Sequence, residues 1–172
     1  MANPEVEARR LREEAGAAEV PVRVDKIAQA LGVALVEEKL DRNVSGLLFR
    51  RGEDKAIGVN ASHSPVRQRF TIAHELGHLR LHPGRELILD HVLLNLRDKV
   101  SSLGTDKEER EANAFAAELL MPASEVTAEV RRLVDRGQTP NARFIADLAI
   151  YFDVSDQAME YRLVHLGLWR QI

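Results

Sequence analysis

Two histidines four positions apart, His74 and His78, limit most strongly what this chain can be. The pair Ser64-Pro65 predicts a helix start before them, and His82-Pro83-Gly84 predicts its end. Residues four positions apart share one face of a helix, with Cβ atoms about 5–6 Å apart. The two imidazoles can therefore reach one ion, at roughly 2.0–2.1 Å if it is zinc.

Glu75, which follows the first histidine, gives the motif a chemical interpretation. Its carboxylate can reach a water on the metal rather than the metal itself. Zinc lowers the pKa of such a water toward about 7, so that Glu75 can accept its proton and later pass it to a leaving amine. The competing interpretation is two solvent-facing histidines beside a surface glutamate. The apolar helix favours the metal site, as does Gly77, which would let another backbone approach at a helix cost near 1 kcal/mol.

A third ligand is required, because a catalytic zinc binds three protein groups and keeps a fourth position open. The chain has no cysteine, so this ligand must be His, Asp or Glu. His82 continues the four-residue spacing, but it lies about 12 Å along the helix axis from His74, so we expect a helix-end residue there. His91 is a weaker candidate.

Three glutamates begin the helix predicted over residues 105–120. Glu108 fits a capping box with Thr105 as the N-cap residue. Glu111 projects away from the apolar stripe of this helix, alongside Glu118, and we expect both in solvent. The positions of Glu108 and Glu111 are therefore explained without a metal.

The remaining glutamate, Glu109, lies at the edge of the apolar stripe, on one face with Asn113 and Ala116. A carboxylate in this position needs a reason to be there, and metal ligation supplies one. Asn113 could orient a metal-ligating group by a hydrogen bond. We therefore choose Glu109 as the third ligand.

The part of the chain before Pro122 mixes helical and strand patterns, which indicates an α+β fold. Its short strands, two of them joined by a turn at residues 51–54, predict a small, mostly antiparallel sheet. Residues 85–104 fit either a strand or a buried helix. The expected helices cover residues 5–15 and 24–31, and the expected strands cover residues 33–37, 45–49 and 55–60.

After Pro122 the pattern is wholly helical, so we expect a core over residues 1–122 and a helical subdomain over residues 123–172. The last two of its three predicted helices have helix-turn-helix spacing. Residues 141–172 carry three basic and four acidic residues, which argues against direct nucleic-acid binding and favours protein docking or support of the core. The predicted helices cover residues 124–135, 141–152 and 156–166.

Charge and hydropathy exclude several other classes of protein. The chain has 172 residues, a formal net charge of −3 and a pI near 6.1, so no global basic field attracts nucleic acid. Its first residues begin a charged helix rather than a signal segment. Apolar stretches are far shorter than the roughly 20 residues of a bilayer span. We expect a cytoplasmic protein that does not enter membranes.

In two signatures the sequence resembles the ImmA/IrrE family of metallopeptidases. Residues 69–78, which read Arg-Phe-Thr-Ile-Ala-His-Glu-Leu-Gly-His, resemble the active-site helix of the family. Residues 109–122, which end in Leu-Leu-Met-Pro, resemble its second signature. The strand over residues 57–60 and the tail from Phe152 to Leu163 fit as well, so the likeness covers nearly the whole chain.

This resemblance implies a zincin-like core followed by a helical, helix-turn-helix-like C-terminal subdomain. It implies that His74, His78 and Glu109 bind zinc and that Glu75 is the catalytic base. Family members typically cleave a partner repressor of the XRE helix-turn-helix type, which releases genes of phages, mobile elements or stress responses. Manganese could replace zinc, since sites built from nitrogen and oxygen donors select metals weakly.

Two other functions stay open at the level of the sequence. The chain could be a non-catalytic, antitoxin-like module that binds DNA or protein, or its zinc could be structural. Three ligands beside a glutamate, with no fourth protein ligand evident, favour an open catalytic position instead. The residue that stabilises a transition state is not assigned, and the candidates are Tyr151, Tyr161, His63, His91 and Arg69.

Overall fold

A computed structural model of the protein describes residues 2–84, 86–91 and 105–169. The helices and strands expected from the sequence are present, with ends that differ by about two residues at most. In chain order the elements are α1 (Pro4–Glu14), α2 (Val24–Ala30), β1 (Ala34–Glu38), β2 (Val44–Arg51), β3 (Asp54–Asn60), α3 (Pro65–Leu81), β4 (Leu87–His91), α4 (Thr105–Leu120), α5 (Ala123–Asp135), α6 (Ala142–Phe152) and α7 (Asp156–His165).

The four strands form one mixed sheet in the order β1-β3-β2-β4. The β2–β3 and β2–β4 pairs are antiparallel and β1 pairs with β3 in parallel, so the sheet is mostly antiparallel, as expected. Because β3 returns beside β2 after a tight turn, its other edge is left for β1. Gly52 has a φ of 59° in that turn, a conformation that glycine adopts without strain.

Residues 85–104, which fitted either a strand or a buried helix, are a strand where the structure describes them. Leu87–His91 forms β4 at the edge of the sheet next to β2. Residues 92–104 lie outside the described part of the chain. So do the side chains of His91 and Thr105, and with them the predicted capping box.

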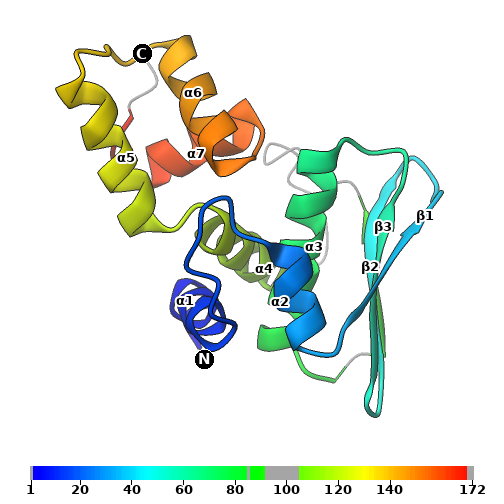
Figure 1. Cartoon of the computed structure of the whole chain (residues 1–172). Coiled ribbons are helices and arrows are strands. Elements are labelled where there is room, and N and C mark those ends of the chain that lie inside the picture. Colours follow the sequence, from blue (N-terminus) through cyan, green and yellow to red (C-terminus); the bar gives the residue numbers. More distant parts are fainter. Residues whose placement is uncertain (1, 85, 92–104, 170–172) are drawn as a thin grey trace.

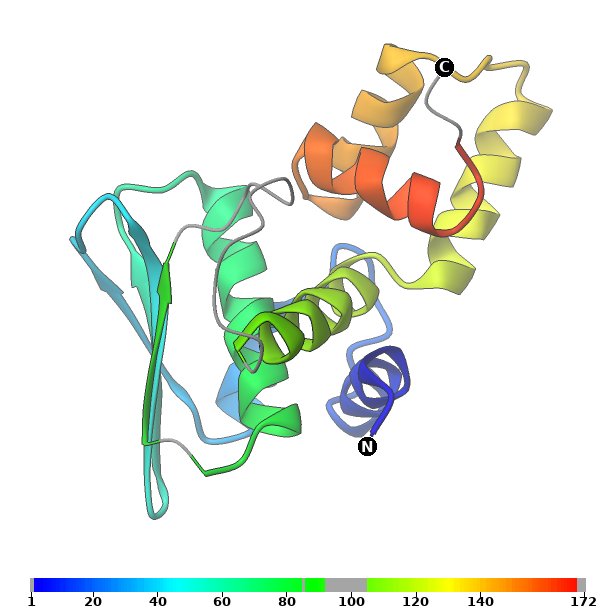
Figure 2. The same ribbon diagram turned by 180° about the vertical axis from the view of Figure 1, so that it is seen from behind.

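The core lies between the sheet and the helices (Figure 1). Alternation along the strands turns Leu48 and Ile57 inward, where both are fully buried, and leaves Phe49 36% exposed on the other face. Helix α3 packs on the inner face of the sheet, and α4 packs on α3. Helix α1 packs against α4, on the side away from the sheet (Figure 2). This layering buries α3 between the sheet and α4.

Helices α5, α6 and α7 gather beyond the C-terminal end of α4 (Figures 1 and 2). The guanidinium of Arg162 in α7 forms an ion pair with Glu118 in α4 and donates to the backbone oxygen of Met121 at 2.9 Å. Arg9 from α1 also contacts Glu118, at 3.2 Å. The expectation that Glu118 is in solvent was therefore wrong: its side chain is 2% exposed, because two distant arginines neutralise it.

None of the helices in the described part of the chain combines the length and the apolar character that a bilayer crossing requires.

Candidate metal centre

Helix α3 carries its two histidines and the intervening glutamate into the interior. Ser64 is its N-cap residue and Pro65 its first residue, as predicted. His74 is 7% exposed, His78 1% and Glu75 0%. These values exclude the interpretation that both histidines are ordinary surface residues.

The close packing of α4 on α3 depends on Gly77. A methyl group at this position would lie 3.2 Å from the Cα and O atoms of Ala112 and 3.2 Å from a ring carbon of Phe115. The glycine therefore lets the backbone of α4 approach α3, as the sequence indicated. The approach brings the first turns of α4, which carry Glu109, beside the two histidines.

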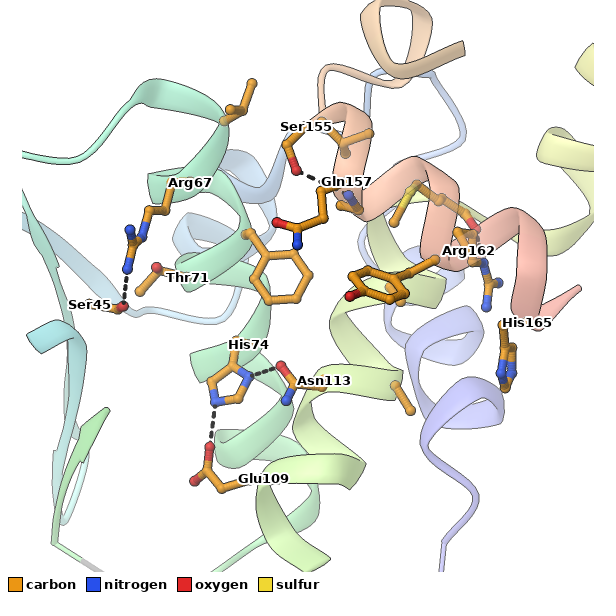
Figure 3. A pocket seen from close by; sticks show the side chains of 18 of the residues that line it. Ser45, Arg67, Thr71, His74, Glu109, Asn113, Ser155, Gln157, Arg162 and His165 are labelled. Atoms are coloured by element: carbon orange, nitrogen blue, oxygen red, sulfur yellow. Dashed lines mark hydrogen bonds and ion pairs between the residues drawn. The ribbon is translucent and has the colours of Figure 1, made fainter. Parts of the chain in front are cut away.

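Three ligand atoms converge where the two helices meet. The Nε2 atoms of His74 and His78 are 3.0 Å apart, and they lie 3.3 Å from Oε2 and from Oε1 of Glu109, respectively. A tetrahedral ion with bonds of about 2.0–2.1 Å requires its ligand atoms to be about 3.3 Å apart. The donor set and its spacing therefore fit zinc. Figure 3 shows the carboxylate of Glu109 directed at the ring of His74.

The Glu109 carboxyl is held in its ionised form. Burial raises its pKa. Hydrogen bonds to His74 and His78 and the charges of both rings lower the pKa by more than burial raises it, so that it lies well below the ordinary value. Ligation of a metal requires the carboxylate. Glu109 therefore needs no proton release before it binds a cation.

The second nitrogen of each histidine also has a partner. Nδ1 of His74 is 3.0 Å from Oδ1 of Asn113, and Nδ1 of His78 is 3.0 Å from Nδ1 of His82. Nε2 of His82 is in turn 3.0 Å from Oε2 of Glu111. Such outer hydrogen bonds fix the orientation of metal-ligating imidazoles, and in the neutral tautomers that ligation requires they leave both Nε2 lone pairs for an ion.

His82 and Glu111, which lie outside the three converging groups, both have more contacts than the sequence predicted. His82 is the C-cap residue of α3, so its placement at the helix end is confirmed, but it also orients His78. Glu111 does not stand free in solvent as expected, because His82 and Lys107 both contact it and its side chain is 24% exposed. The spacing of His78 and His82 was the available signal for this link, since such pairs share a helix face.

Glu75 lies beside the three ligands, against strand β2. A methyl group at Gly46 would lie 3.1 Å from Oε1 of Glu75 and 2.4 Å from Cγ2 of Thr71. Only a glycine at this point in β2 lets the strand pass so close to the helix. The carboxylate is thereby held between α3 and the sheet, and it is not one of the three groups that converge.

A cavity of about 600 Å³ opens beside the cluster and separates it from helix α7. His74, Glu109 and Asn113 line its floor, and residues of α7, including Gln157 and Arg162, line the opposite wall (Figure 3). Arg67, one of the lining residues, was not singled out by the sequence, although it shares the helix face of Thr71 and His74. Two of the three converging groups can therefore be reached from the cavity.

The other candidates for a reactive role lie in varied positions. Tyr161 lines the cavity and is 38% exposed, whereas Tyr151 is 44% exposed and packs its ring on Phe152. Arg69 forms an ion pair with Asp153 at 2.9 Å. His63 is half-buried at the loop before α3. Of these four residues, the structure places only Tyr161 in the lining of the cavity.

Comparison with known proteins agrees with this geometry. A family model described as the IrrE N-terminal-like domain matches residues 28–164. The radiation response metalloprotease IrrE of Deinococcus deserti is 35% identical over 112 residues, which are 64% of this chain and 36% of that protein. Its counterpart in Deinococcus radiodurans is 32% identical over 112 residues, which are 64% of this chain and 31% of that protein.

More distant similarities extend to a phage and to a solved structure. An uncharacterized immunity region protein 2 of Bacillus phage phi105 is 28% identical over 99 residues, 56% of this chain and 57% of that protein. A Mycobacterium tuberculosis transcriptional regulator shares the fold with a TM-score of 0.62 and 18% identity, over 95% of this chain and 46% of that chain. The chain thus spans between 31% and 57% of the length of these proteins.

The fold and the site together define an α+β protein in which two histidines of one helix and a carboxylate of a second helix form a group that could hold one metal ion. The family model covers most of the chain. The chain belongs to the ImmA/IrrE family, which is a family of metallopeptidases.

Proposed function

We propose that this protein is a zinc-dependent endopeptidase, with His74, His78 and Glu109 as metal ligands and Glu75 as the catalytic base. The observation that carries the proposal is the convergence of two imidazole nitrogens, 3.0 Å apart, and the Glu109 carboxylate, whose two oxygens each lie 3.3 Å from one of them, beside a buried glutamate and an open cavity. A structural zinc site would instead be closed by a fourth protein ligand. Manganese, which accepts similar ligands, is the alternative ion.

Each residue has a defined task in this proposal. A bound zinc ion supplies Lewis acidity, which polarises the scissile carbonyl and acidifies a water molecule. The Glu75 carboxylate accepts the proton of the attacking water and delivers it to the leaving amine. Asn113 and His82 keep the ligand imidazoles oriented through their Nδ1 atoms. The packing of β2 against α3 keeps the Glu75 side chain away from bulk water.

The substrate that we propose is a repressor of the XRE helix-turn-helix type. The names of two relatives support a regulatory setting, since one is a radiation response metalloprotease and the other an immunity region protein. Cleavage of such a repressor would release phage, mobile-element or stress-response genes. Because repressors act on chromosomal DNA, the reaction would take place in the cytoplasm.

We propose a zincin-like core over residues 1–122 and a helix-turn-helix-like subdomain over residues 123–172 that docks the substrate. Several residues of α7 line the cavity, among them Gln157, Tyr161 and Arg162. A helix that reads DNA needs this face exposed to the major groove. The position of α7 therefore supports a role in substrate docking over direct DNA binding.

The test is cleavage of the XRE-type repressor encoded beside the gene of this protein. Zinc-loaded wild-type protein should cut it at one site, and the Glu75→Gln variant should bind one equivalent of zinc without cutting. A non-catalytic module or a structural zinc site would retain its function in the variant. An intact repressor at full metal occupancy of the wild type would contradict the proposal. A parallel assay with manganese identifies the more active ion.

A further inference from the structure

Most of the charged side chains that line the cavity are paired with a group of opposite charge. Glu109 contacts both ligand histidines, and Glu5 lies 3.1 Å from His165. Arg162 is paired with Glu118. The remaining lining cation is Arg67, and no carboxylate is paired with it in the part of the chain that the structure describes.

The surroundings of Arg67 give its charge little compensation. Its Nη2 atom donates to the hydroxyl oxygen of Ser45 at 3.3 Å, and its Nε atom is inaccessible to solvent and makes no hydrogen bond. Burial lowers the pKa of its guanidinium, although arginine stays charged in proteins. A partly buried cation with a neutral partner is poorly stabilised until an anion binds. Figure 3 shows the side chain extending toward Ser45 at the start of β2.

The position of Arg67 relates it to the metal centre. Arg67, Thr71, His74 and His78 follow one another at helical spacing and share one face of α3. Arg67 therefore precedes His74 by about two turns, or roughly 10 Å along the axis. An extended peptide covers that distance in about three residues. The N-terminus of α3 lies at the same end and adds its partial positive charge.

We propose that Arg67 binds a carboxylate of the substrate, about three residues from the bond that is cut. This inference rests on the proposed endopeptidase function and names a specificity of the same cavity. The carboxylate belongs either to an Asp or Glu side chain or to the free C-terminus of the substrate. The planar guanidinium donates two parallel hydrogen bonds to either group.

The experiment compares wild-type protein with Arg67→Gln, Arg67→Lys and Arg131→Gln. Arg131 is an exposed arginine of α5 outside the cavity lining, so its variant is the matched control for loss of charge. In one arm, each zinc-loaded protein cuts a mixed peptide library and mass spectrometry locates the cleavage sites. In the other arm, proteins that combine each of these changes with Glu75→Gln are used to select displayed random peptides by binding alone. C-terminally amidated peptides separate the two sources of the carboxylate.

We expect Asp or Glu to be enriched at one fixed position in wild-type protein, at least tenfold over Asn or Gln, since a hydrogen bond to a charged group contributes about 1.5–3 kcal/mol. Arg67→Gln should abolish the enrichment, Arg67→Lys should keep part of it, and Arg131→Gln should leave it unchanged. If amidation removes recognition, the C-terminal carboxylate is the ligand.

The two arms distinguish failure of this inference from failure of the proposed function. Cleavage without acidic enrichment, or enrichment that persists in Arg67→Gln, overturns the carboxylate site and leaves the peptidase standing. Acidic enrichment by binding without any cleavage supports the carboxylate site and contradicts the peptidase. If no peptide is bound and none is cut, the result contradicts both the carboxylate site and the peptidase.

Discussion

The Nδ1 atoms of His78 and His82 lie 3.0 Å apart at the end of α3, so only one of them carries a hydrogen. If Nε2 of His78 offers its lone pair to a metal, its Nδ1 must be protonated and donates to His82. His82 is then protonated at Nε2, which donates to Oε2 of Glu111 at 3.0 Å. One tautomer assignment thus links a carboxylate near the surface to a metal-ligating imidazole.

Loss of His82 should weaken metal binding. A His82→Phe variant keeps an aromatic ring at the helix end but removes the acceptor for His78, and we expect the Kd for zinc to rise about 10–100-fold. Competition with a chromophoric chelator measures it. Glu111→Gln should have a smaller effect, because the amide oxygen still accepts from His82. His165→Ala, a change at an exposed histidine, is the control. A Kd within twofold of wild type for His82→Phe would contradict the link between His82 and metal binding by His78.

The approach of β2 to α3 predicts a sensitive position at Gly46. In Gly46→Ala the new methyl group would meet Cγ2 of Thr71 at 2.4 Å and the backbone oxygen of Gly58 at 2.9 Å. We expect the free energy of unfolding to fall by about 1–3 kcal/mol, as in other overpacked cores. The cleavage rate should fall by more than the loss of folded protein explains, because the methyl group also displaces Glu75.

A double-mutant cycle identifies the cause of the Gly46 effect. Thr71→Ser removes the Cγ2 atom of the shortest contact, so the combination with Gly46→Ala should recover part of the lost stability in urea unfolding. The contact with the Gly58 oxygen persists, so recovery is incomplete. Strictly additive effects of the two changes would show that this contact is not the origin of the strain.

The buried ion pair of Glu118 and Arg162 predicts an asymmetry between two substitutions. Glu118→Ala leaves the Arg162 charge buried, since both side chains are 2% exposed, and should lower stability by about 3–5 kcal/mol. Arg9→Ala removes a 49% exposed partner of the same carboxylate and should change stability by less than about 1 kcal/mol. Thermal or urea unfolding compares them. Equal effects of the two changes would contradict the assignment of Arg162 as the main partner of Glu118.

Local signals were sufficient to predict helix α3, which carries the two histidines, and helix α4, which packs on it. The Ser64-Pro65 start, the spacing of His74 and His78, and Gly77 all express regularities within one helix turn or at a helix end. The choice of Glu109 followed from its place at the edge of an apolar stripe, and the structure brings it to the two histidines.

The errors of the sequence-based predictions concern partners distant in the chain. Glu118 looks like a solvent-facing residue on its own helix, but Arg162 is 44 positions away and Arg9 is 109 positions away. The mostly antiparallel sheet was predicted correctly, but the parallel pair, β1 with β3, depends on the order of strands in space. Periodicity describes an element and cannot name what packs against it, so these relationships emerge only in three dimensions.

His63 gives a prediction about pH. Burial lowers the pKa of its imidazole below the ordinary 6.5, and the charge of Arg67 lowers it further. The unfolded chain therefore takes up this proton more readily. The contribution of His63 to the free energy of unfolding is intact above pH 6.5 and decreases as pH falls through that value toward the folded pKa. An NMR titration should show a depressed pKa that rises in Arg67→Gln, and an unchanged pKa in that variant would contradict the coupling.

Zinc should stabilise the fold by an amount that reports the ligand set directly. An ion that binds only the folded chain raises the free energy of unfolding by about 1.4 kcal/mol for each tenfold rise in free zinc above its Kd. Wild-type protein and Glu75→Gln should both show this slope in urea unfolding at buffered zinc concentrations. Glu109→Gln should show it only at much higher zinc, because the neutral amide is a poor substitute for the carboxylate between the two histidines. Glu19→Gln, at an exposed glutamate, is the matched control. A wild-type response in Glu109→Gln would mean that another group completes the site.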